Sequence, residues 1–111
     1  MKAEGNIGYI KNGSYVSYSN VDFGSGVKSI ELSVSSATKG GEIELRQGGV
    51  DDALLATITV ERTGAWQNWQ TVSAQLDPAT SAKLKGKQNI TLVFKGKIKG
   101  YLFNISWFQF S

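Results

Sequence analysis

The stretch Thr63-Gly-Ala-Trp-Gln-Asn-Trp69 places two of the three tryptophans of this 111-residue chain three positions apart, just after a glycine. A tryptophan ring carries a large apolar area and one N–H donor, so a folded chain either buries the ring or presents it to a ligand. We therefore predict that one of the two tryptophans packs in the core and that the other contacts a ligand.

Side chains that commonly perform catalysis are scarce. The chain has no cysteine and no histidine, which excludes thiolate nucleophiles, imidazole bases and the usual zinc and haem ligands. Nine carboxylates remain, and their spacing singles out no pair. Glu42 and Glu44 would share one face of a strand, but we interpret them as solvated charges beside Arg46. We predict that the protein is not an enzyme and has no cofactor.

The net charge of +3 is unevenly distributed, because all nine acidic residues lie at or before Asp77. Six lysines follow it: Lys83, Lys85, Lys87, Lys95, Lys97 and Lys99. One interpretation is a patch that binds nucleic acid or another anionic polymer. We favour the alternative, in which these lysines protect exposed strand edges from pairing with another chain, because no arginine or aromatic residue lies among residues 95–100. We predict no nucleic-acid partner.

Apolar residues recur at every second position along most of the chain, a pattern typical of half-buried strands. Turn signals rich in glycine and asparagine separate the apolar segments. The pattern predicts an all-β sandwich or barrel of about eight strands, folded as a single domain over residues 1–111. The apolar positions are Ile30, Leu32, Val34, Ile43, Leu45, Ala56, Ile58, Val60, Val72, Ala74, Leu76, Ile90, Leu92 and Phe94.

Residues 77–83 form the one candidate helical turn, with Asp77 as its cap and Pro78 at its first position. No apolar run approaches the roughly 18 residues of a membrane span, so we predict no membrane partner. The first residues lack the apolar run of a signal peptide, and the compartment is not predicted.

Two segments break the alternation. In residues 101–110 both faces carry apolar side chains, which indicates a strand buried on both sides or a bulge near Trp107. Trp69 and Val72 are three positions apart, so a regular strand would point them to opposite faces. We therefore predict a second bulge at the start of that strand.

Five motifs follow one another along the chain: Gly8-Tyr-Ile-Lys-Asn-Gly-Ser-Tyr-Val16, Asn20-Val-Asp-Phe-Gly-Ser-Gly26, Gly41-Glu-Ile-Glu-Leu-Arg46, Gly64-Ala-Trp-Gln-Asn-Trp69 and Leu102-Phe-Asn-Ile-Ser-Trp-Phe-Gln-Phe110. In this order they resemble the motifs of family 6 carbohydrate-binding modules, and the resemblance covers residues 6–110. It implies a β-sandwich of jelly-roll topology that has no catalytic activity and binds polysaccharide close to a glycoside hydrolase.

The resemblance also implies a binding cleft in the loops at one end of the sandwich. Two aromatic rings there clasp a sugar and an asparagine amide binds its hydroxyls; by motif these are Tyr9, Trp66 and Asn104. The alternative is a loop tyrosine, a partly buried tryptophan and a backbone cap. Trp69 is then the core tryptophan, and Trp107 and Phe108 are assigned to the core because they lie in apolar strands.

Some members of the family also bind sugar on the concave face of one sheet. Tyr15, Glu44 and Lys95 would lie near such a second surface, although exposed strand residues of these types are common.

The chain departs from the family pattern at two places. The family has about twenty residues between an opening Ala-Glu strand and the Gly-Tyr-Ile motif, and that loop forms one wall of the cleft and supplies ligands to a structural calcium ion. Here Lys2-Ala-Glu4 is followed almost at once by Gly5-Asn-Ile7, and Ser106 replaces an acidic ligand. Calcium needs six to eight oxygen ligands, so we predict no bound metal.

The two losses together suggest a trimmed or engineered module. The main hypothesis is binding of β-linked polysaccharide, such as xylan, cellulose or a related glucan, by a monomer. The alternative is a redesigned jelly-roll scaffold with weak sugar binding or none. A short connection after the first strand also allows a strand-swapped dimer.

Overall fold

The computed structural model describes residues 2–111, except for the side chain of Lys2. Eight strands and one short helix form in the described chain, which confirms the predicted number of strands. The elements are β1 (Lys2–Ile7), β2 (Tyr15–Asp22), β3 (Ser29–Ser35), β4 (Gly41–Gln47), β5 (Leu54–Val60), β6 (Gln70–Gln75), α1 (Pro78–Lys83), β7 (Lys87–Lys95) and β8 (Asn104–Phe110).

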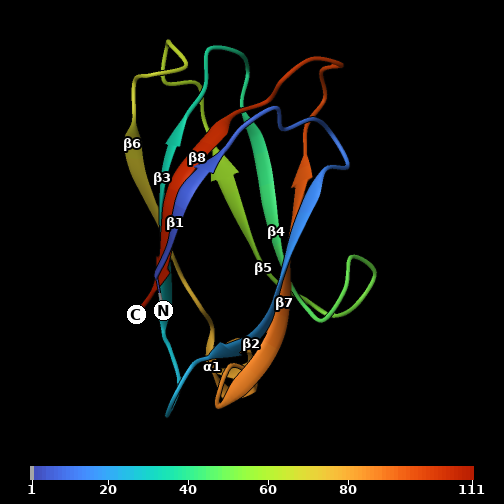
Figure 1. Cartoon of the computed structure of the whole chain (residues 1–111), viewed down its shortest axis with the longest axis vertical. Helices are drawn as coiled ribbons and strands as arrows, with labels where there is room; N and C mark the ends of the chain where they lie inside the picture. The colour runs from blue at the N-terminus through green and yellow to red at the C-terminus, as the bar shows by residue number, and fades with distance from the viewer. Residues whose placement is uncertain (1) are drawn as a thin grey trace.

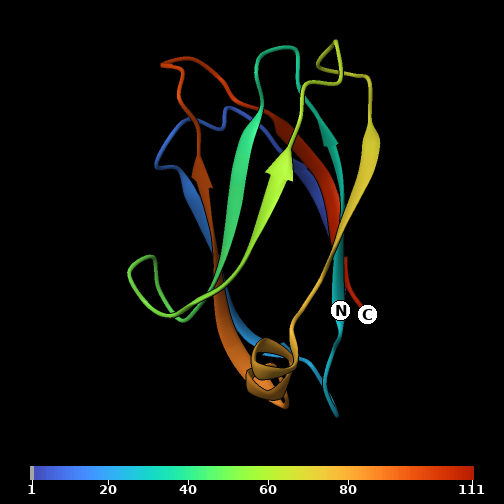
Figure 2. The ribbon, with the colours of Figure 1, turned by 180° about the vertical axis from the view of Figure 1, so that it is seen from behind.

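The strands form two four-stranded antiparallel sheets that face each other (Figures 1 and 2). One sheet has the order β1-β8-β3-β6 and the other has the order β2-β7-β4-β5. Each sheet alternates early and late strands of the chain, which is the arrangement of the double Greek key in a jelly roll. The predicted all-β sandwich of jelly-roll topology is confirmed.

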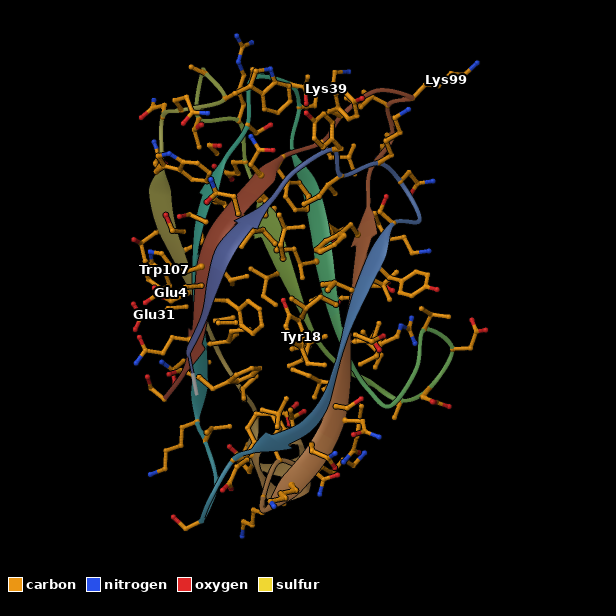
Figure 3. The ribbon with its side chains drawn as sticks, viewed as in Figure 1. Glu4, Tyr18, Glu31, Lys39, Lys99 and Trp107 are labelled. Carbon is orange, nitrogen blue, oxygen red and sulfur yellow. The ribbon has the colours of Figure 1, made fainter. Side chains whose placement is uncertain are left out.

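The core fills the space between the sheets. Alternate residues of β3, β4 and β7 point inward and are almost completely buried, among them Leu32, Leu45 and Leu92. Aromatic rings meet edge to face within this layer, as Tyr18 does with Phe108 at 5.2 Å between centroids. Figure 3 shows Tyr18 between the sheets, and burial raises the pKa of its hydroxyl.

β8 contains the predicted bulge. Ser33 pairs with Trp107 and Val34 pairs with Ile105, so Ser106 is the extra residue. The extra residue shifts the alternation of side chains by one position, so Ile105 and Phe108 both face the core.

Trp107 consequently points away from the opposite sheet, beside Glu4 and Glu31 (Figure 3). It is half-buried on the outer face, so its assignment to the core is wrong. The same assignment is confirmed for Phe108, which is 1% exposed.

α1 begins as predicted, with the Asp77 carboxylate accepting a hydrogen bond from the Thr80 N–H at 2.8 Å and Pro78 in the first turn. No helix in residues 2–111 is long and apolar enough to cross a membrane.

The interpretation of the late lysines as edge protection is wrong. β7 lies between β2 and β4, so its lysines border a central strand that is paired on both sides. β7 also separates the six lysines into two groups. Lys83, Lys85 and Lys87 lie at the α1 end, and Lys95, Lys97 and Lys99 lie at the opposite end.

Candidate functional site

A cleft of about 420 Å³ opens at the end of the sandwich away from α1. Three parts of the chain supply its walls: the end of β1 with the turn after it, the loop that precedes β6, and the segment that leads into β8. The lining residues are Asn6, Ile7, Gly8, Tyr9, Trp66, Gln67, Trp69, Tyr101 and Asn104.

Backbone and side-chain hydrogen bonds fix the loop of residues 61–69 that carries both tryptophans. The Ser36 carbonyl accepts from the N–H groups of Thr63 and Gly64 at 2.9 and 3.0 Å. The Thr63 hydroxyl accepts from the Ser36 N–H at 2.9 Å, and the Asn68 amide donates to the Thr63 carbonyl. Gly64 has φ of 101°, a backbone conformation that favours glycine. These contacts give the loop a defined shape before any ligand binds.

The carbonyl of Trp66 is held by two donors from the neighbouring sheet. The buried Ser35 hydroxyl donates to it at 2.6 Å, and the Asn104 side-chain nitrogen donates at 3.4 Å. Because an amide has two N–H donors and one acceptor oxygen, Asn104 retains one N–H and its oxygen for a ligand. A Cβ at Gly8 would lie 3.5 Å from that oxygen, so the absent side chain leaves the amide accessible.

Two tyrosines form the opposite part of the cleft. The side chain of Tyr9 is 82% exposed, and its backbone has φ of 56°, which is uncommon for a residue other than glycine. Its ring meets Tyr101 edge to face at 5.5 Å, and the Lys11 ammonium lies 5.2 Å from the Tyr101 centroid. The nearby Leu102 N–H donates to the carbonyl of buried Ile10 at 2.8 Å, which ties the two segments together.

The structure thus brings Tyr9, Trp66 and Asn104 to one cleft, as the motifs predict, while their role in binding stays a prediction. The assignment of Trp69 to the core is wrong, because this residue is half-buried, lies outside the core cluster and lines the cleft with Trp66. It precedes β6, whose pairing with β3 shows no register shift, so the bulge predicted there is also wrong.

Sequence reasoning missed the place of Tyr101 in this cleft. The available signal was an aromatic residue directly after Gly100, where the chain leaves a loop before a buried strand.

The proposed second surface comes together only in part. Tyr15 and Glu44 both lie opposite Val93, on either side of β7 and on the outer face of the sheet. Glu44 forms an ion pair with Arg46 at 2.9 Å, which agrees with the interpretation of Glu44 as a charge beside Arg46. Lys95 lies further along β7, opposite Glu42, and lines a different hollow.

The calcium ligands of the family do not have a counterpart that fits. Glu4 lies opposite Trp107 across the β1–β8 pair, and the nearest part of β8 contributes Ser106. No group of three or more acidic side chains that could hold a metal ion occurs within residues 2–111. Since calcium requires six to eight oxygen ligands, several of them carboxylates, these donors are too few to hold the ion.

The lining of the cleft suits an uncharged polar ligand that has an apolar face. Four aromatic side chains lie beside the amides of Asn6, Gln67 and Asn104, and no carboxylate of residues 2–111 lines the cleft. Aromatic faces contact C–H groups, and amides donate and accept hydrogen bonds without a net charge. A sugar ring has both kinds of surface.

Comparison with known proteins agrees with this chemistry. The family profile described as carbohydrate binding module (family 6) matches residues 1–111. A family 6 module from Clostridium cellulolyticum, solved in complex with xylose, is 42% identical with a TM-score of 0.85, over 96% of this chain and 78% of that one. A β-1,3-glucan-binding module from Bacillus halodurans is 41% identical with a TM-score of 0.85, over 95% and 75% of the two chains.

Similar segments also occur inside larger enzymes. Endo-1,4-beta-xylanase A of Thermoclostridium stercorarium is 38% identical over 105 residues, which is 95% of this chain and 18% of that protein. The chain spans less than a fifth of the length of the curated relatives that it matches. With a family profile that matches from end to end and solved members that share its fold, the chain belongs to family 6 of the carbohydrate-binding modules.

Proposed function

We propose that this chain binds β-linked polysaccharide in the cleft and does not change it chemically. Trp66 and Tyr9 supply the aromatic faces that contact the sugar rings, and Asn104 is the polar anchor for their hydroxyls. The observation that carries the proposal is the convergence of these side chains, from three separate segments, on one cleft without a carboxylate among the described lining residues.

Xylan is the first polysaccharide to test, followed by cellulose and related glucans. The similar module from Clostridium cellulolyticum was solved with xylose, and one from Clostridium stercorarium, 36% identical, was solved with cellobiose. Several curated relatives carry the names of enzymes that act on xylan or arabinoxylan. Xylan and cellulose both consist of β-linked rings whose faces an aromatic cleft can contact.

A scaffold with weak sugar binding or none is the second candidate. The observation that favours it is the short connection from Gly5 to Gly8, which stands where the family has a longer wall. Asn6, Ile7 and Gly8 line the cleft in its place. A shallower wall encloses less of a ligand, and affinity for small ligands depends on the enclosed surface.

We also propose that residues 1–111 act as one binding unit and as a monomer. β1 pairs with β8 of its own chain, which completes the sheet without a second copy. Light scattering at high protein concentration should give the monomer mass, and a dimer mass would support strand exchange.

Isothermal titration calorimetry with xylohexaose, cellohexaose and laminarihexaose tests the proposal directly. We expect binding of at least one of them by the wild type and loss of that binding in Trp66→Ala. Tyr9→Ala should weaken binding, whereas Tyr15→Ala is the matched control, because Tyr15 is also an exposed tyrosine, at 61%, but lies outside the cleft.

The outcomes separate the candidates. A wild type that binds none of the oligosaccharides supports the scaffold. If Tyr15→Ala weakens oligosaccharide binding more than Tyr9→Ala does, the binding site lies on the outer face of the sheet that carries Tyr15.

A further inference from the structure

A second hollow, of about 330 Å³, lies at the same end of the sandwich as the cleft, and its lining is cationic. Four basic side chains line it, Lys39, Arg62, Lys95 and Lys97, together with two acidic ones, Glu42 and Glu61. We call it the cationic groove. The six charges leave a formal excess of two positive charges, whereas the cleft has no charged lining residue among those described.

The cations of the groove are available to a ligand. Lys39, Lys95 and Lys97 are exposed, and within residues 2–111 the structure shows no ion pair for these three lysines or for Arg62. Figure 3 shows Lys39 at the loop end of the molecule. Lys99, also labelled there, extends away from the body of the sandwich and does not line the groove.

The groove and the cleft are made by the same connecting segments. Residues 61–69 supply Glu61 and Arg62 to the groove and Trp66 and Trp69 to the cleft. Residues 96–103 supply Lys97 to the groove and Tyr101 to the cleft.

Hydrogen bonds fix the segments that carry the two sites. The Thr38 hydroxyl, next to Lys39, donates to the Tyr101 carbonyl at 2.9 Å, and the Gly96 N–H donates to the Asn12 side-chain oxygen at 3.2 Å. The groove and the cleft therefore lie on connected segments at one end of the sandwich, where one polysaccharide chain can contact both.

Close backbone packing forms the floor of the groove. A Cβ at Gly40 would lie 2.0 Å from the Val60 carbonyl oxygen, and one at Gly41 would lie 2.3 Å from that of Lys95. Glycine is required at both positions, at and just before the start of β4, because the backbone of the neighbouring strands leaves no room for a side chain.

We propose that the cationic groove binds the carboxylate of a uronic acid carried by the polysaccharide whose neutral backbone occupies the cleft. This inference rests on the proposed function and names a substrate class for it: acidic β-linked polysaccharide, such as xylan substituted with uronic acid. A carboxylate is ionised at neutral pH and pairs with lysine and arginine.

The lining of the groove favours such a carboxylate over nucleic acid. No aromatic side chain lines the groove in the described chain, so bases have no ring on which to stack there. Glu42 and Glu61 would repel a continuous phosphate backbone, while a single carboxylate needs only one or two of the four basic side chains.

The test compares two xylo-oligosaccharides of equal backbone length, one with a single glucuronic acid group and one without it, by isothermal titration calorimetry. We expect the wild type at low salt to bind the acidic oligosaccharide about threefold to tenfold more tightly, the range of one or two exposed ion pairs. Sodium chloride at about 0.5 M should remove this difference by screening and leave the neutral oligosaccharide unaffected.

A pair of variants locates the effect. Lys39→Gln/Lys95→Gln/Lys97→Gln should bind both oligosaccharides equally, whereas Lys83→Gln/Lys85→Gln/Lys87→Gln should keep the wild-type preference. The second variant removes the same charge from the opposite end of the sandwich, so it controls for net charge.

Each other result overturns the inference. Equal affinity of the wild type for the two oligosaccharides overturns it and leaves the proposed function intact, whereas binding of neither overturns both. Equal loss of preference in the two variants would assign the effect to net charge. Tighter binding of single-stranded oligothymidylate, lost in the first variant, would assign the groove to nucleic acid.

Discussion

At the scale of single residues, the four rings of the cleft differ in how each is held. The loop backbone places Trp66 through the bonds on its carbonyl, while Tyr9 and Tyr101 support each other edge to face. Trp69 lies just before β6, where it is half-buried and lines the cleft with Trp66. A ring in this position adds contact area to the cleft and little to the core.

Trp69→Ala should therefore weaken sugar binding about tenfold, or about 1.4 kcal/mol, as expected for an aromatic residue within a binding site. Its free energy of unfolding should fall much less than that of Phe108→Ala, for which about 3–5 kcal/mol is expected because Phe108 is buried. Calorimetric titration and urea unfolding of both variants provide the comparison. An equal loss of unfolding free energy in the two variants would show that Trp69 contributes to the core as Phe108 does.

At the scale of elements, the site depends on the loop of residues 61–69 and its attachment to the end of β3. Ser35 and Ser36 at that end bind the backbone of the loop through hydroxyl, N–H and carbonyl groups. Both serines are buried, so their hydrogen bonds are shielded from water and specify the position of the loop.

Ser35→Ala tests this attachment, because it removes the short bond to the Trp66 carbonyl and no atom that could reach the ligand. We expect a loss of about 1 kcal/mol in the free energy of unfolding and a several-fold weaker sugar affinity. Ser35→Thr, which keeps the hydroxyl, should restore most of the affinity, as measured by titration calorimetry. Unchanged affinity in Ser35→Ala would show that the loop holds its shape without this bond.

The Asp77 cap of the short helix α1 leads to a prediction about how stability depends on pH. The N–H of Thr80 donates to the Asp77 carboxylate, and this bond lowers the pKa of Asp77 below its ordinary value of 3.8. A lowered pKa in the folded state means that ionised Asp77 stabilises the fold above pH 3.8 and that this contribution is lost as the pH falls through the lower value.

The free energies of unfolding of wild type and Asp77→Ala should therefore differ at neutral pH and converge below pH 3.8. Urea unfolding across the acidic range measures the difference. A difference that stays constant over the whole range would contradict a role for the charge of Asp77.

At the scale of the whole molecule, two sheets face each other across one continuous apolar core. The cleft and the cationic groove lie at one end, and α1 lies at the other (Figure 1). No group of three or more acidic side chains that could hold a metal ion joins the two sheets within residues 2–111.

Removal of calcium should accordingly have no effect on stability. The thermal unfolding midpoint is expected to be the same with excess EDTA as with millimolar calcium chloride, since no group of three or more acidic side chains that could hold the ion occurs within residues 2–111. Differential scanning calorimetry in the two buffers measures this. A midpoint raised several degrees by calcium would reveal a site built from other oxygens.

The amino-acid sequence by itself determined the strands, their number and the cap of α1, because side-chain alternation and capping are local properties of a chain. Its motifs also singled out Tyr9, Trp66 and Asn104, which the fold brings to one cleft. The bulge in β8 was visible as a break in alternation, but which side chain it turned outward was not.

Only the tertiary structure decided the place of Trp69, Tyr101 and the late lysines. Each of these depends on contacts between segments far apart in the sequence, such as the bonds from Ser36 to residues 63 and 64 and the pairing of β7 between β2 and β4. A run of lysines that looks uniform along the chain is divided by the length of β7 between two ends of the molecule. The alternation of side chains indicates which face of a strand a residue occupies. Which loops meet at an end of the sandwich depends instead on the order of the strands in the sheets, which is not a local property of the chain.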